Sequence, residues 1–154
     1  MGLLMRRCLL LSSLLLAAVS VLAGGWLVRL EGRQEFSVNI EARGVQLSGI
    51  CIVKTDEDGS RGAIVNEFGI HALDFTLSAD RRKVKLLNVM PQMNRWYVKR
   101  VVRKDLRLLF SATEAGRQKG RRVVAVDGDG AVTLTNEKYK LTYSLKEIED
   151  ETGE

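Results

Sequence analysis

The sequence has one histidine, one proline and two cysteines among its 154 residues. Cys8 lies in an apolar N-terminal run, so Cys51 would stand alone in the processed chain, where no intramolecular disulfide could form. We interpret Cys51 as a small buried strand residue rather than as a reactive thiol. The near absence of proline, together with 14 glycines, is typical of short strands joined by tight turns.

A strong excess of charge of one sign is also lacking. The formal net charge is +5, and Arg6 and Arg7 in the N-terminal segment supply two of those charges. This excess is too small to indicate nucleic-acid binding. Hydrophobic residues make up 45% and charged residues 28% of the chain, which are the values of a globular protein and do not favour disorder.

The first 23 residues have the three parts of a secretory signal peptide. Arg6 and Arg7 precede an apolar run, and Val21-Leu22-Ala23 supplies the small residues that a signal peptidase reads. We expect cleavage after Ala23. Because the run from Cys8 to Val28 is about 21 residues long without a charge, an uncleaved membrane anchor is the alternative. Both versions place the domain outside the cytoplasm, in the periplasm or at the outer face of the inner membrane.

After a linker at 24–34, the sequence pattern predicts a β domain that reaches residue 146. Eight segments have strand-like patterns, and the first five follow one another at spacings of about ten residues, which favours an antiparallel meander. The pairs Asp58-Gly59 and Asp127-Gly128 mark two hairpin turns. The expected strands are 35–42, 45–55, 61–67, 70–78, 82–88, 121–127, 131–135 and 138–146, with a basic loop at 116–120 and an acidic tail at 147–154.

Two of these strands predict where particular side chains point. In the second strand, Ile50 and Ile52 make the second face apolar as well, so we expect another element to cover that face. In the fourth strand, strict alternation places His71 beside Phe75 on the apolar face and Asp74 on the opposite face.

Apolar residues recur at helical spacing from Gln92 to Ser111, just after Pro91, a position where proline is tolerated. They are Val98, Val102, Leu106 and Leu109. An open sheet with one apolar face must cover that face, and this amphipathic helix is the available lid. We therefore predict a mainly β (α+β) fold: a curved antiparallel sheet or unclosed β-barrel with one lid helix, preceded by an N-terminal signal or anchor helix.

The sequence contains no recognisable catalytic or metal-binding motif. A nucleophile needs a base within reach, and His71 is the sole histidine. The acidic run 56–58 sits at a hairpin tip without the ligand spacing of a calcium loop. Glu67 and Asp74 could form a carboxylate pair, but their spacing does not single them out. We expect no enzymatic activity, no metal and no cofactor.

The most distinctive run joins 66–69 to Leu73-Asp74-Phe75. We interpret it as a hairpin in which Gly69 provides the turn and Phe68 packs with Phe75; a ligand contact is the alternative.

The helix carries a second distinctive feature, because basic residues lie along its outer face against a single acid, Asp105. These basic residues are Arg95, Lys99, Arg100, Arg103, Lys104 and Arg107.

The simplest interpretation of these basic residues is a solvated outer face. The alternative is a contact with anionic lipid headgroups or with an acidic partner such as a membrane protein complex. Trp96 and Tyr97 at the start of the helix could sit at such an interface.

Several short runs resemble small uncharacterised envelope proteins of gram-negative bacteria: SGICIVK at 48–54, IVNEFG at 64–69, LDF at 73–75 and the basic VRKDL at 102–106. Those proteins in turn resemble the lipoprotein-localisation carriers and receptors, LolA and LolB. The resemblance covers about residues 35–146. It implies an unclosed β-barrel whose helical lid covers an apolar cavity for acyl chains. This chain is shorter, has one lid helix where the carriers have several, and lacks the lipidated cysteine of the receptor.

We therefore expect a non-enzymatic envelope protein that binds lipid or lipoprotein acyl chains between sheet and helix, driven by burial of apolar surface. The alternative is a structural or interaction module that docks a membrane complex or an anionic membrane surface through the basic helix. The residues expected to line the lipid site are Val53, Leu73, Phe75, Val98, Val102 and Leu109.

Overall fold

Nine antiparallel strands form one sheet in the computed structural model, which describes residues 25–149. The predicted signal peptide at 1–23 and the end of the acidic tail lie outside these residues. The strands are β1 (Arg33–Ala42), β2 (Val45–Asp56), β3 (Gly59–Asn66), β4 (His71–Ser78), β5 (Val84–Leu87), β6 (Gln118–Lys119), β7 (Arg122–Val126), β8 (Val132–Asn136) and β9 (Leu141–Glu147). The predicted mainly β fold is confirmed, and the predicted loop at 116–120 contains the short strand β6.

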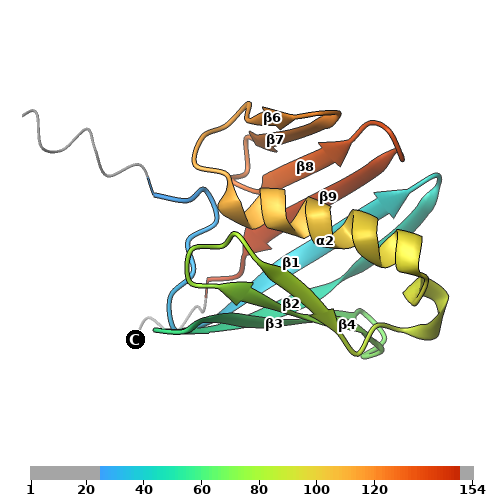
Figure 1. Ribbon diagram of the computed structural model, residues 1–154, viewed down its shortest axis with the longest axis horizontal. Helices are drawn as coiled ribbons and strands as arrows, with labels where there is room; N and C mark the ends of the chain where they lie inside the picture. The colour runs from blue at the N-terminus through green and yellow to red at the C-terminus, as the bar shows by residue number, and fades with distance from the viewer. Residues whose placement is uncertain (1–24, 150–154) are drawn as a thin grey trace, which may run out of the picture.

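The sheet is unclosed, with β5 and β6 at its two edges (Figure 1). Its strand order is β5-β4-β3-β2-β1-β9-β8-β7-β6, so the first and last strands pair at its centre. The register places Ala42 opposite Val45 on one side and opposite Leu141 on the other. The β1–β2 turn and the β8–β9 turn therefore lie side by side at the same end of the sheet.

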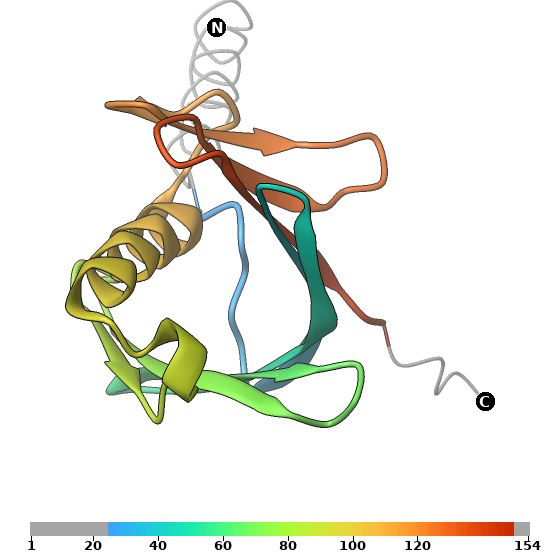
Figure 2. The ribbon, with the colours of Figure 1, turned by 90° about the vertical axis from the view of Figure 1, so that its right-hand side faces the viewer.

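The helix α2 (Trp96–Ser111) crosses the concave side of the curved sheet (Figure 2). Its end at Ser111 is as predicted, but its predicted start at Gln92 is wrong. Pro91–Met93 form a separate 3-10 turn, η2, and the extended backbone of Arg95, with φ −112° and ψ 139°, interrupts the helical path before Trp96. Within residues 25–149, no helix is long and apolar enough to cross a membrane.

A packed core fills much of the space between helix and sheet. The rings of Phe75 on β4 and Phe110 on α2 have their centroids 5.3 Å apart, a favourable distance for aromatic pairs. The predicted contact between Phe68 and Phe75 is wrong. The side chain of Asn66 accepts hydrogen bonds from the backbone N–H groups of Phe68 and Ile70, and the turn that it closes leaves Phe68 79% exposed.

A β-bulge between β3 and β4 moves His71 off the apolar face. Ile64 pairs with Leu73 and Val65 pairs with His71, so Ala72 is an extra residue on β4. Both Ala72 and Leu73 are buried, and the alternation shifts by one residue there. The Nε2 atom of His71 lies 2.6 Å from Oδ1 of Asp74. The prediction that His71 and Asp74 lie on opposite faces is therefore wrong.

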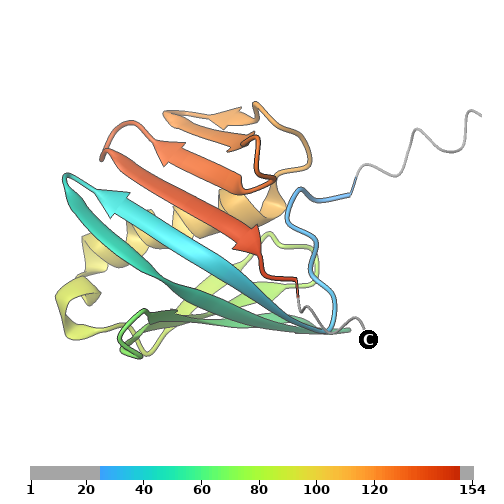
Figure 3. The same cartoon turned by 180° about the vertical axis from the view of Figure 1, so that it is seen from behind.

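Contrary to the prediction, no helix or strand among residues 25–149 covers the outer face of β2. Figure 3 shows this convex side of the sheet, with α2 behind it. Ile50 is exposed and Ile52 is half-buried. Their cross-strand neighbours, which include Val65 opposite Ile50 and Ala63 opposite Ile52, provide the shielding that these two side chains have.

The segment predicted as a linker packs onto the folded domain. Residues 25–32 contain no helix or strand, but the N–H of Leu27 donates to the carbonyl of Ala112 at 2.8 Å. Val28 is buried in the core. The chain therefore reaches β1 from the end of the molecule where α2 terminates.

Arg81 fastens this segment to the helix. From the turn between β4 and β5, its guanidinium donates to the carbonyls of Val28 at 2.6 Å and Phe110 at 2.7 Å. The same group lies 4.0 Å from the ring centroid of Trp26. Burial lowers the pKa of Arg81 to about 10, so the group stays charged at neutral pH. One side chain thus provides the hydrogen-bond donor for a carbonyl at the C-terminus of α2 and for a carbonyl in the N-terminal segment.

Cys51 is buried on β2 as a free cysteine, as predicted. Burial raises the pKa of its thiol from about 9 to about 12, because the thiolate would lose its hydration. The thiol is therefore inert in the folded protein at neutral pH.

The raised pKa of Cys51 predicts a loss of stability in alkali. The unfolded chain releases the thiol proton above pH 9, whereas the folded chain keeps it. The contribution of Cys51 to the free energy of unfolding therefore falls as the pH rises. Between pH 9 and 11 the free energy of unfolding should drop by about 2–3 kcal/mol more in the native chain than in Cys51→Ala. Urea denaturation of both proteins at the two pH values measures this difference. Parallel pH profiles would refute the prediction.

Candidate apolar ligand site

A pocket of about 600 Å³ lies at the end of the molecule where α2 begins. This volume is in the range of roughly 300–1,000 Å³ that is typical of ligand sites. Its walls come from the first half of α2, the segment before it, and the ends of β1, β2 and β9. The lining residues are Ile40, Ala42, Arg43, Val45, Leu47, Met90, Met93, Tyr97, Val98, Val101, Val102, Tyr139, Leu141 and Tyr143. Arg43 is the charged residue among them.

The sizes of the side chains on α2 explain why the space is open at this end. The first half of the helix presents the valines at 98, 101 and 102, whereas the second half buries Leu106, Leu109 and Phe110. The larger side chains fill the second half, where the remaining gap is about 10 Å³, no more than one water molecule could occupy. The interior is thus solid under one half of the helix and open under the other.

The structure separates the six residues that were predicted to line a lipid site. Val98 and Val102 line the pocket. Phe75 and Leu109 surround the small gap in the packed core, and Val53 and Leu73 are fully buried within that core. The apolar periodicity therefore marks the interior correctly, but it does not distinguish its filled part from its open part.

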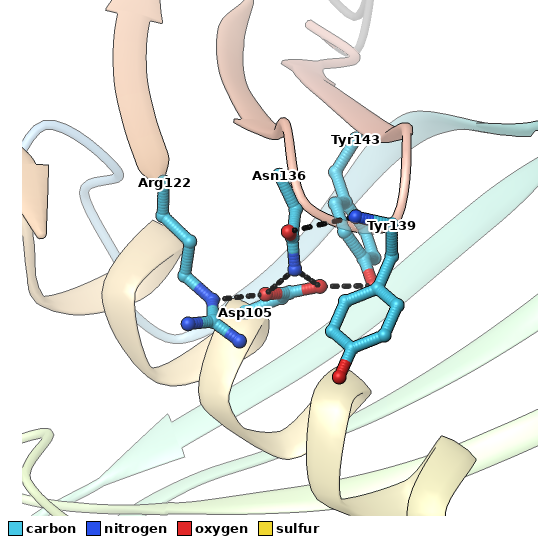
Figure 4. Close-up of polar contacts among 5 residues, drawn as sticks. All are labelled: Asp105, Arg122, Asn136, Tyr139 and Tyr143. Carbon is cyan, nitrogen blue, oxygen red and sulfur yellow. Dashed lines mark hydrogen bonds and ion pairs between the residues drawn. The ribbon is translucent and has the colours of Figure 1, made fainter. Parts of the chain in front are cut away.

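A buried carboxylate contacts Tyr143, one of the residues that line the pocket. Asp105 on α2 has no exposed surface and accepts hydrogen bonds from three side chains (Figure 4). The donors are Nε of Arg122 at 2.5 Å, Nδ2 of Asn136 at 3.0 Å and the hydroxyl of Tyr143 at 2.8 Å. These residues come from β7, β8 and β9, so one carboxylate joins the helix to three adjacent strands.

This cluster fixes the tyrosine that lines the pocket. Desolvation by burial raises the pKa of the Tyr143 hydroxyl well above 10, and the negative charge of Asp105 adds to this effect. The hydroxyl therefore stays protonated and donates to Asp105. Because this hydrogen bond occupies the Tyr143 proton, the ring presents mainly apolar surface to the pocket.

The burial of Asp105 and its bonds to the sheet were not predicted from the sequence, although its position on the helix indicates burial. Asp105 follows Val102 by three residues and precedes Leu109 by four, which places it on the apolar stripe of the helix. An acid at such a position requires partners, because an unpaired buried charge is very costly. The sequence does not show which strands supply those partners.

The six basic residues predicted for a partner contact all lie at the surface of the structure. Arg95, Arg100, Arg103 and Lys104 are exposed, and Lys99 and Arg107 are half-buried. Trp96 and Tyr97, which directly follow Arg95, are 73% and 55% exposed. The start of α2 therefore combines aromatic and cationic surface beside the opening of the pocket.

His71, Asp74 and Asn88 form a hydrogen-bonded group elsewhere on the surface. Oδ2 of Asp74 accepts a bond from Nδ2 of Asn88 at 2.7 Å, and its other oxygen contacts His71. No serine, threonine or cysteine is bonded to this His71 in the described part of the chain, so the geometry of a nucleophile with its base is not formed there.

The chain matches no protein-family model, and none of the curated proteins matches it. Its function must therefore be inferred from the pocket, the exposed charges and the buried side chains of this molecule.

Proposed function

We propose that this protein is a non-enzymatic carrier or receptor that binds the acyl chain of a lipid or lipoprotein in the pocket beneath the first half of α2. The observation that supports the proposal is an open volume of about 600 Å³ whose walls are almost wholly apolar. Burial of an acyl chain there would remove apolar surface of both ligand and protein from water.

The chemistry of the walls favours a chain without polar groups. The valine, leucine, isoleucine and methionine side chains offer dispersion contacts but no hydrogen bonds. The hydroxyl of Tyr143 is engaged by Asp105. Arg43, Tyr97 and Tyr139 are the other lining residues with polar side-chain atoms. A polar ligand would therefore lose its hydration over most of the pocket and gain few partners, which costs free energy. These properties agree with the resemblance to lipoprotein-localisation proteins that the sequence indicates.

Filling the pocket should prevent binding. We expect Val101→Trp to lower retention of lysophosphatidylcholine by about tenfold or more, because the indole would occupy the space of the acyl chain. Native mass spectrometry of the full-length chain, released from a mild detergent after incubation with this lipid, measures the bound fraction.

The matched control is Val126→Trp, since Val126 lies exposed on β7 away from the pocket. This variant adds the same side chain and should retain the lipid like the native chain. Equal retention by Val101→Trp and the native chain, or no retention by the native chain, would contradict the proposal.

The exposed basic face of α2 favours a second function, in which the domain docks a membrane complex or an anionic membrane surface. Such a module would lose its partner when Arg95 and Arg103 are changed to glutamate, with an unaltered melting temperature because both side chains are exposed. Pull-down from solubilised membranes measures the loss. Val101→Trp, which replaces none of the basic residues of α2, should not affect such docking.

A further inference from the structure

A second hollow adjoins the apolar pocket at the start of α2. It has a volume of about 360 Å³ and shares Tyr97, Val101 and Tyr139 with the apolar pocket. We call it the cationic groove, because its other lining residues include four positive side chains and no carboxylate. These other residues are Trp96, Arg100, Lys104, Arg122 and Lys138.

Most of the charge in the cationic groove is not neutralised by the protein. Arg122 pairs with the buried Asp105. In the described part of the chain, Arg100, Lys104 and Lys138 have no carboxylate within ion-pair distance. The neighbouring charge of Arg100, with contributions from Arg122 and Arg107, lowers the pKa of the exposed Lys104 ammonium. Cations that repel one another in this way favour a bound anion.

We propose that the ligand is a lipid with an anionic headgroup, whose phosphate lies in the cationic groove while its acyl chain occupies the apolar pocket. This inference rests on the proposed function and adds the class of lipid to it. Phosphate oxygens accept hydrogen bonds from guanidinium and ammonium groups, and such charge-assisted bonds are the strong ones. Trp96 and Tyr97 stand where the chain meets the headgroup, a position that suits aromatic rings with one apolar side.

The shared wall between the two hollows favours a lipid over an acidic peptide. Tyr97, Val101 and Tyr139 border both spaces, so the occupant must carry its charge and its apolar chain in one molecule, side by side. A single-chain anionic lipid has this form. An acidic peptide would match the charges of the groove but would leave the apolar volume unfilled.

A competition between two lipids with the same acyl chain tests the headgroup. The full-length chain is incubated with equal amounts of lysophosphatidylglycerol and lysophosphatidylcholine, and native mass spectrometry compares the two bound forms. We expect the native chain to prefer the anionic lipid by about tenfold or more. The variant R100Q/K104Q/K138Q should bind the two lipids in about equal amounts, and it should still retain the neutral lipid.

The control variant R61Q/K83Q/K85Q removes the same residue types at a separate hollow lined by residues of β3, β4 and β5, and it should keep the preference of the native chain. Equal uptake of both lipids by the native chain, or an unchanged preference in R100Q/K104Q/K138Q, would overturn this inference and leave the proposed function standing. If the native chain retains neither lipid, the proposed function itself is wrong.

Discussion

Replacing Asp105 by alanine is expected to lower the free energy of unfolding by about 3–5 kcal/mol. The substitution removes the acceptor of Arg122, Asn136 and Tyr143 at once and leaves the half-buried guanidinium of Arg122 without its partner. Buried donors without acceptors cost about 1–3 kcal/mol each. Urea denaturation followed by circular dichroism measures the change.

Arg103→Ala is the matched control, because Arg103 lies on the exposed side of the same helix. Its effect should stay within about 0.5 kcal/mol. Asp105→Asn keeps the shape of the side chain and should cost less than Asp105→Ala, since the amide oxygen can still accept from Tyr143. A destabilisation by Asp105→Ala no larger than that of Arg103→Ala would show that the cluster does not hold the helix on the sheet.

Arg81→Ala should destabilise the domain by a similar amount, about 3–5 kcal/mol. The variant leaves the buried carbonyls of Val28 and Phe110 without their donor and removes the cation above the ring of Trp26. Arg81 also has a φ of +58°, and alanine would keep this unfavourable backbone conformation without the contacts that offset it.

Two further variants separate these contributions. Arg81→Gly relieves the positive φ and should unfold at a higher urea concentration than Arg81→Ala. Arg82→Ala, at the exposed neighbouring position, should leave the denaturation midpoint nearly unchanged. If Arg81→Ala and Arg82→Ala have the same midpoint, the contacts of Arg81 contribute nothing measurable to stability.

The sequence predicted the architecture well because local signals dominate it. Short turns join most neighbouring strands, so hydrophobic alternation and turn residues locate the elements to within a few positions. Two of the errors arose where one residue departs from the regular repeat. The extra residue Ala72 reverses the face of His71, and the extended Arg95 delays the start of the helix. Neither departure changes the local hydrophobic pattern enough to be detected.

The candidate site was predictable only in part. The stripe of apolar residues on α2 showed that Val98 and Val102 face the sheet, and both line the pocket. The rest of the pocket comes from turns that are distant in sequence, with Arg43 and Tyr139 brought together by the pairing of β1 with β9. Non-local pairing of this kind and the volume left between side chains depend on packing in three dimensions, which periodicity does not reveal.

The hydrogen bond from Leu27 to Ala112 places the N-terminal segment at the opposite end of α2 from the pocket. Residues 25–32 join the domain beside the C-terminus of α2, whereas the pocket opens beside its N-terminus, and a helix of 16 residues spans about 24 Å. None of residues 25–32 lines the pocket, so a ligand can enter it without passing the segment that leads into the domain.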